Sequence, residues 1–190
     1  MAGGPSLRAI DTTRLLGRKV IALNSSFLRV PFADYLVIGD GRVWRRHWRD
    51  HRAALEQFAG RIITVAPINH PRLLRMLAPP VGRDGVARYG ERAHELMFRK
   101  TVLATGMNLA GHLGVAELIL LGADGQRAPD GACHHHPPHP WDLKPGCWEA
   151  MVPDLEACTA ALADRGVIVR NASPGSAFTL WPIVNLEDTL

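Results

Sequence analysis

The amino-acid sequence predicts an α/β fold in which helices pack against a mostly parallel sheet. Its strands are expected at residues 19–24, 35–40, 61–65, 118–122 and 167–169. Three of them (19–24, 35–40 and 118–122) are apolar at nearly every position, which is typical of parallel strands buried between two helix layers. The strands also alternate with longer segments of helical periodicity, and this alternation indicates an α/β sheet.

The helices are expected between these strands, at residues 7–16, 43–58, 91–113 and 148–165. Each segment places apolar residues three or four positions apart, so that one face can pack against the sheet. Residues 66–90, rich in proline and glycine, are expected to form an irregular excursion over the ligand edge of the sheet. This excursion is either a lid or an ordinary surface loop, and residues 71–77 could form a helical turn or two within it.

The chain closes with residues 179–190, which are expected to pack on the core through four neighbouring apolar side chains: Phe178, Leu180, Trp181 and Ile183. It contains no internal repeat and no linker. A length of 190 residues is enough to bury a substantial core. We therefore expect a single domain over residues 1–190.

Composition excludes several classes of protein. The chain has 47% hydrophobic and 21% charged residues, as globular proteins do, and no apolar run approaches the ~20 residues of a membrane helix. It begins without the charged and hydrophobic regions of a signal peptide.

Its three cysteines lack CxxC spacing, which argues against a disulfide framework or a structural zinc site. We expect a cytoplasmic protein with no membrane span, and a homo-oligomer is left open.

The net charge of +4 comes largely from arginine, and the densest basic stretch is residues 42–49. Interleaved arginines and tryptophans could contact nucleic acid. They could equally form the solvated face of a helix whose Trp44 and Trp48, four residues apart, pack inward. No second basic patch supports the nucleic-acid interpretation, so we favour the helix face and expect no nucleic-acid partner.

The opening turn, Gly3-Gly4-Pro5-Ser6, has the composition of an anion site. Two glycines let the backbone approach a ligand closely. Pro5 suits a first helical position, where its missing N–H costs nothing, and Ser6 adds a hydroxyl beside free N–H groups. The turn therefore predicts phosphate binding, although a flexible glycine-containing tail would have the same sequence.

Polar residues or glycines stand at or just after the carboxyl ends of the predicted strands: Asn24, Ser25, Asp40, Gly122, Asp124, Asn171 and Ser176. Ligands of open α/β sheets collect at this edge. Each residue also has a structural interpretation, since Asn24 and Ser25 could cap a helix, Asp40 could form a turn and Asn171 an Asx turn. Their coincidence at one edge predicts a nucleotide site.

The loop at residues 125–147 is rich in proline and histidine, and three of its histidines are candidate catalytic residues: His134, His136 and His139. A neutral imidazole can act as a general base near pH 7 or ligate a metal. Adjacent histidines before two prolines cannot all point one way, so a base is favoured over a metal site, and a polar surface loop remains the alternative.

Several of these segments carry the motifs of one group of proteins: residues 3–7, 20–26, 31–36, 108–114, 119–124 and 170–176, together with Asp40 and the histidine loop. They resemble the G-x-GPSL, "IAvN" and "P-ADyL…D" signatures of bacterial and prophage Rossmann-like proteins. Related members include the archaeal 6-hydroxymethylpterin diphosphokinase, flagellin-modifying glycosyltransferases and, more remotely, family 42 sialyltransferases. The resemblance covers most of the chain.

The resemblance implies a Rossmann-like three-layer sandwich that binds a nucleotide or nucleotide-sugar. Carried over from the sialyltransferases, Gly4, Pro5, Ser6 and Asn24 would hold the nucleotide, and one of the loop histidines would serve as the base. The chain departs from the group at two points. Only Met1-Ala2 precede the glycine turn, so the first strand is missing or truncated, and residues 101–103 replace a Ser-Gly pair that opens a long helix.

The leading functional hypothesis is a nucleotide- or nucleotide-sugar-dependent transferase, most like a glycosyltransferase, acting on a small-molecule or glycan acceptor. A Mg²⁺-dependent diphosphokinase of the pterin type is the rival enzyme, with ATP as its nucleotide and Asp40 and Asp124 as candidate ligands of the metal. A non-catalytic phage or prophage accessory protein that kept the fold is the third hypothesis. The transferase itself implies no metal.

Overall fold

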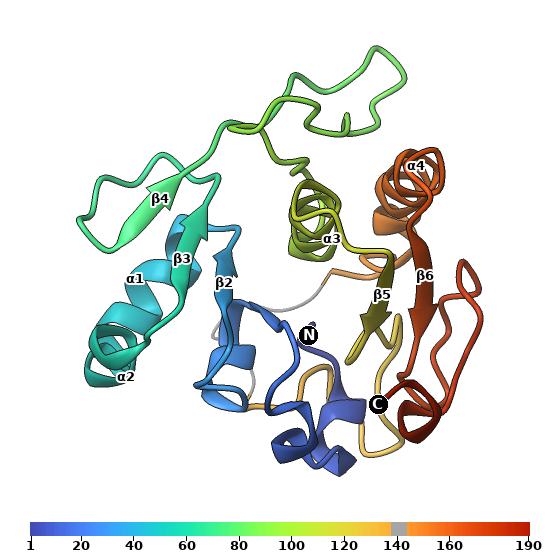
Figure 1. Ribbon diagram of the computed structural model, residues 1–190, viewed down its shortest axis with the longest axis horizontal. Helices are drawn as coiled ribbons and strands as arrows, with labels where there is room; N and C mark the ends of the chain where they lie inside the picture. The colour runs from blue at the N-terminus through green and yellow to red at the C-terminus, as the bar shows by residue number, and fades with distance from the viewer. Residues whose placement is uncertain (138–143) are drawn as a thin grey trace.

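The computed structural model describes residues 1–137 and 144–190 and shows an α/β protein with parallel strands (Figure 1). Four strands form the larger sheet in the order β1-β2-β3-β4, all parallel: Ile21–Leu23, Tyr35–Ile38, Arg61–Thr64 and Leu73–Arg75. The strands β5 (Glu117–Leu120) and β6 (Ile168–Asn171) form a second parallel pair. The five predicted strands are thus confirmed, and the predicted helical turns at 71–77 are wrong, because β4 lies there instead.

Met1 and Ala2 join the two sheets. The Met1 amino group donates to the Ile21 carbonyl (2.7 Å), and the Leu23 N–H donates to the Met1 carbonyl (3.0 Å). On the other side, the Ala2 N–H donates to the Leu121 carbonyl (2.7 Å). Two hydrogen-bonded residues, Met1 and Ala2, therefore lie between β1 and β5, where the first strand is expected.

Helices cover both faces of the strands: α1 (Gly41–Asp50), α2 (Arg52–Gln57), α3 (Val102–His112) and α4 (Val152–Ala163). Short 3₁₀ helices complete the chain: η1 (Pro5–Ala9), η2 (Thr12–Leu15), η3 (Asn24–Leu28), η4 (Glu149–Met151) and η5 (Leu186–Thr189). No helix among the described residues is long and apolar enough to cross a membrane.

Two predicted helices are divided. The single helix expected at residues 7–16 is two 3₁₀ turns, η1 and η2, and the helix expected at 43–58 breaks at His51 between α1 and α2. The amphipathic character of α1 is confirmed, because Trp44 is buried and Trp48 stacks on it with ring centroids 5.3 Å apart.

The helix predicted from residue 91 begins only at Val102. Asn108, fully buried in α3, explains the difference, because its side-chain oxygen accepts from the Gly90 and Met97 N–H groups (2.7 and 2.8 Å). These bonds hold the preceding backbone in an irregular path. Buried Asp154 adds further bonds, accepting from the Ala87 and Lys100 N–H groups (2.9 and 3.2 Å). The resulting loop projects beyond α3 and β4 in Figure 1.

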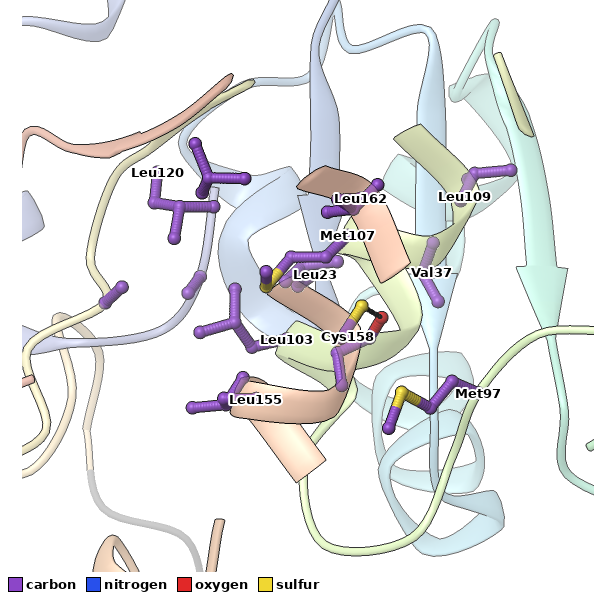
Figure 2. Close-up of a cluster of buried hydrophobic side chains, with 14 of the residues drawn as sticks. Leu23, Val37, Met97, Leu103, Met107, Leu109, Leu120, Leu155, Cys158 and Leu162 are labelled. Carbon is purple, nitrogen blue, oxygen red and sulfur yellow. Dashed lines mark hydrogen bonds between the residues drawn. The ribbon is translucent and has the colours of Figure 1, made fainter. Parts of the chain in front are cut away.

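The strands present alternate residues to two hydrophobic clusters. Leu23, Val37 and Leu120 pack against α3 and α4, as Figure 2 shows, whereas Ala22 and Leu36 face α1 and the 3₁₀ turns. Of the closing segment, Trp181 is buried as expected, but Ile183 is 51% exposed. The strands are therefore covered on both faces, in agreement with their apolar sequence.

The core between α3 and α4 predicts a large effect of truncation at Leu155, which is fully buried. We expect Leu155→Ala to lower the free energy of unfolding by about 2–5 kcal/mol, because it removes buried methyl groups and leaves a cavity. Leu16→Ala is the control, since Leu16 is 61% exposed, and it should change stability by less than about 0.5 kcal/mol. Urea unfolding measures both, and similar values for the two variants would contradict this packing.

Candidate functional site

A cavity of about 220 Å³ lies at the carboxyl ends of β1 and β5. It brings together eight residues that the sequence assigns to the site: Gly3, Gly4, Asn24, Ser25, Gly122, Asp124, His134 and His136. These residues come from the opening turn, from the segments after β1 and β5, and from the histidine loop. His139 lies outside the described residues.

The glycine turn is held against the end of β5. The Gly4 N–H donates to the Gly122 carbonyl (2.9 Å). Ser6, one residue into η1, donates to Asp124 through both its N–H (3.3 Å) and its hydroxyl (3.0 Å). The carboxylate therefore occupies the helix start where the sequence predicts a phosphate, and Ser6 does not line the cavity. Burial raises the pKa of Asp124, while the hydrogen bonds from Ser6 oppose that rise.

Asn24 follows β1 directly and has a left-handed backbone, with φ of +49°. Among the described residues it is the only non-glycine with positive φ. Asparagine tolerates this region better than most residues, but a non-glycine there still indicates a local constraint. Its side-chain oxygen accepts from the Gly39 N–H at 3.4 Å. Backbone strain of this kind gathers at ligand sites, so Asn24 is a candidate ligand contact.

Ser25 connects the cavity to a buried histidine. Its hydroxyl lies 3.2 Å from His47 Nε2 in α1, and His47 is 3% exposed. Burial lowers the pKa of His47 to about 4, so the ring is neutral at neutral pH. Its other nitrogen, Nδ1, has no hydrogen-bond partner within the described part of the chain. His47 is therefore a buried ring of which one nitrogen has a partner and the other has none among the described residues.

The histidine loop forms one wall of the cavity. The rings of His134 and His136 stack with centroids 4.9 Å apart and an interplanar angle of 4°. His135 anchors the loop to the glycine turn, because its N–H donates to the Gly3 carbonyl (3.2 Å). Burial lowers the pKa of His134 to about 4 and also lowers the pKa of His136. Both rings are therefore neutral near pH 7 and can accept a proton.

The N-terminus of α3 forms a further wall, and it lies eleven residues later than the sequence predicts. Thr101 caps this eleven-residue helix by accepting the Leu103 N–H on its hydroxyl (3.1 Å). Thr101, Val102 and Leu103 all line the cavity. The free N–H groups and the positive end of the helix dipole lie where the resemblance expects a Ser-Gly pair. The signal that could have found this start is the capping residue Thr101 itself.

Five predicted site residues do not line the cavity: Pro5, Ser6, Asp40, Asn171 and Ser176. Asp40 caps α1, accepting from the Arg42 N–H (2.7 Å), and its ion pair with Arg42 lowers the pKa of its carboxyl. Asn171 and Ser176 donate to the Ala123 carbonyl (3.1 and 2.7 Å). These two residues brace the segment that carries Asp124, and Pro5 is buried in η1.

The cavity also contains residues that the sequence did not single out: Lys100, Gln126, Cys133, Trp148, Met151 and Phe178. Lys100 is the positively charged residue of this lining, and Trp148 and Phe178 provide aromatic surface. Their positions depend on tertiary packing, because they come from separate loops without a shared motif. No group of three or more histidine, cysteine, aspartate or glutamate residues suited to a metal ion occurs within residues 1–137 and 144–190.

Comparison of the chain with protein-family models, with curated proteins and with solved structures finds no match in any of the three. The resemblance to Rossmann-like transferases therefore remains a prediction that depends on the residues quoted for it. The geometry of the cavity is an independent source of functional inference.

Gly4 should not tolerate a side chain, whereas Gly3 should. A Cβ atom on Gly4 would overlap the Asp124 carboxylate and lie 2.5 Å from the Gly122 carbonyl oxygen, but the nearest atom to one on Gly3 would be 3.8 Å away. We expect Gly4→Ala to cost about 1–3 kcal/mol of stability and Gly3→Ala less than about 0.5 kcal/mol. Urea unfolding checks both values, and equal costs would contradict the close approach.

Protonation of His47 should destabilise the protein in acid. Its pKa is about 4 in the folded protein and 6.5 ordinarily, so between these values the unfolded chain binds more protons. Stability should therefore fall as the pH drops from 6.5 towards 4, by up to about 1.4 kcal/mol per pH unit for this group. His47→Gln keeps an amide group near Ser25 and should make the fall shallower in urea unfolding at several pH values. An unchanged slope would contradict the assignment.

Proposed function

We propose that the protein is a nucleotide- or nucleotide-sugar-dependent transferase with a Rossmann-like fold, most like a glycosyltransferase. The observation that carries the proposal is the convergence of Asn24, the N-terminus of α3 and two neutral histidines on one cavity. Open α/β sheets bind nucleotides at the carboxyl ends of their strands, and this cavity lies at such an edge. Part of the quoted motifs supports the proposal as well, because the glycine turn, residues 23–25, residues 122–124 and the histidine loop contribute to the lining of this cavity.

The phosphates of the nucleotide are assigned to the side of the cavity formed by α3. Helix N–H groups and the positive end of the dipole bind anions, and Lys100 adds a positive charge nearby. Near the glycine turn, Asp124 accepts hydrogen bonds from Ser6, and its carboxylate would repel a phosphate if ionised. Gly3 and Asn24 also line the cavity and would contact the sugar or the bridging oxygens.

The base is assigned to His134 or His136. A transfer of this kind needs a group that takes the proton of the acceptor hydroxyl and a site that stabilises the leaving phosphate. The neutral imidazoles supply the first, and α3 supplies the second. A bound phosphate would also raise the pKa of a nearby imidazole towards neutrality, which improves its match to a base at pH 7.

The diphosphokinase alternative is less well supported. It needs carboxylates around Mg²⁺, and its two candidates are separated, because Asp124 lines the cavity whereas Asp40 caps α1 and pairs with Arg42. The accessory-protein hypothesis stays open to the same experiment as the transferase.

The first test is thermal unfolding of the purified chain with nucleotides and nucleotide-sugars, with and without Mg²⁺. A ligand present at 100 times its Kd stabilises the native state by about 2.7 kcal/mol, which for a chain of this size raises the Tm by roughly 5–10 °C. Asn24→Gly keeps the left-handed backbone but removes the amide, and should reduce the shift. The exposed Gln57→Ala is the matched control and should keep it.

The second test uses the nucleotide-sugar that binds. His134→Ala or His136→Ala should slow transfer to an acceptor by about 10²–10⁴-fold while the thermal shift is retained. If both variants transfer at the full rate, the histidines are not the base. Mg²⁺-dependent ATP binding that is lost in Asp124→Asn would favour the diphosphokinase, and a folded chain that binds no nucleotide would favour the accessory protein.

A further inference from the structure

A second and larger cavity, of about 440 Å³, separates β1 from β5. Its sides are the two strands, with Ile21 on one and Leu118 and Ile119 on the other. Ala110 of α3 and Val115, which follows the helix, lie over one face, and Leu186 and Leu190 lie over the opposite face. We call this cavity the slot. In Figure 1 the N-terminus lies in the space between β5 and the larger sheet.

The slot has the width of one strand. Met1 bonds to β1 on one side, and Ala2 bonds to Leu121 just past the end of β5 on the other. Hydrogen bonds on both sides require β1 and β5 to be two strand spacings apart, roughly 9–10 Å. Met1 fills one rung of a parallel ladder opposite Ala22, and the remaining length of the slot extends from its amino group towards the amino ends of both strands.

The parallel ladders direct unused backbone groups into the slot. The Tyr35 N–H donates to the Val20 carbonyl, so in β1 the alternate residues 19, 21 and 23 face away from β2. The Ile168 N–H donates to the Ala116 carbonyl, so residues 117, 119 and 121 likewise face away from β6. Ile21, Ile119 and Leu121 therefore point their N–H groups at the position of a strand between them.

The apolar side chains beside the slot are only half-buried, and the lining also includes the charged residues Arg18, Lys19 and Glu117. Both strands contribute other side chains that are buried in the core. The side chains next to the slot, by contrast, remain partly exposed: Ile21, Leu118 and Ile119. Met1 and Ala2 continue the alternation, with Ala2 in the cluster of α3 and Met1 packed on the opposite cluster. A strand in the slot would bury its side chains on both faces, as central parallel strands do.

We infer that the slot is the binding site of an apolar β-strand of about three residues that immediately precedes Met1 in a longer form of this chain. The occupant is assigned to the same chain because Met1 already pairs in the correct direction and its amino group lies at the mouth of the slot. Counting back from Met1, the first added residue would form backbone hydrogen bonds with Ile119 and Leu121 of the β5 side. The second would form them with Lys19 and Ile21 of the β1 side. The third would form them with Glu117 and Ile119. The first and third would face α3.

The buried amino group supports this inference. Burial lowers the pKa of the Met1 ammonium to about 5, so a terminal charge is unfavourable at the position it occupies. A peptide N–H would make the same bond to the Ile21 carbonyl without a charge to desolvate. The position of the Met1 nitrogen therefore suits a neutral backbone N–H.

Intact-mass measurement provides the direct test. The gene is expressed from its own upstream sequence with a C-terminal tag, and the mass of the purified protein is compared with the 20.8 kDa of the 190 residues plus the tag. A larger mass, accounted for by apolar residues before Met1, is the expected result. A protein that starts at Met1 would overturn the inference.

A second test measures occupancy of the slot. An extension of Met-Lys-Val-Val-Val before Met1 should raise the Tm by about 5–10 °C and slow amide exchange at Ile21, Ile119 and Leu121 by about tenfold or more. The matched control is Met-Lys-Val-Pro-Val, which lacks the N–H for the Lys19 carbonyl and should do neither. Equal shifts for both, or no protection, would overturn the inference. So would a dimer of the unextended chain that already protects these amides, because its occupant would be a second copy.

Discussion

The backbone pairing of Met1 and Ala2 is the interaction on which the arrangement of the two sheets depends. These residues bond β1 on one side and the end of β5 on the other, so the chain's first turn must enter the edge where both strands end. Gly3 and Gly4 follow within the cavity, and the Gly3 carbonyl in turn receives the histidine loop through His135. The position of the candidate base is therefore set by the same few bonds that align the sheets.

Charge is distributed unequally around the cavity, and this restricts what the site can bind. The Asp124 carboxylate accepts a hydrogen bond from Ser6, while the lining also includes Lys100 and the positive end of α3. The histidines are neutral because burial disfavours their charged form. Under the proposed function, this arrangement orients the anionic part of a ligand towards α3 and leaves the acceptor beside the imidazoles. The described lining contains no second carboxylate, because Asp40 caps the N-terminus of α1 instead.

The fold was more predictable from the sequence than the site. Continuous apolar runs identified the strands correctly, because burial on both faces leaves a local signature. The start of α3 was missed, because Asn108 and Asp154 fix the preceding loop by bonds to backbone far along the chain, which no local pattern encodes. At the site, the sequence could place polar residues at one edge. It could not show that Ser6 would bind Asp124, or that His47 would be buried against Ser25.

The bonds of the first residues also impose an order on folding during synthesis. The Ala2 N–H pairs with the Leu121 carbonyl and the Gly4 N–H with Gly122, so the N-terminus cannot take its place until more than a hundred further residues have left the ribosome. At cellular rates of translation this delay is on the order of ten seconds. The sequentially local part of the sheet, β1 to β4, can assemble meanwhile, and closing the long loop back to residue 2 comes late because distant contacts form slowly. The edge that carries the cavity is thus completed only after β1 to β4 are able to pair.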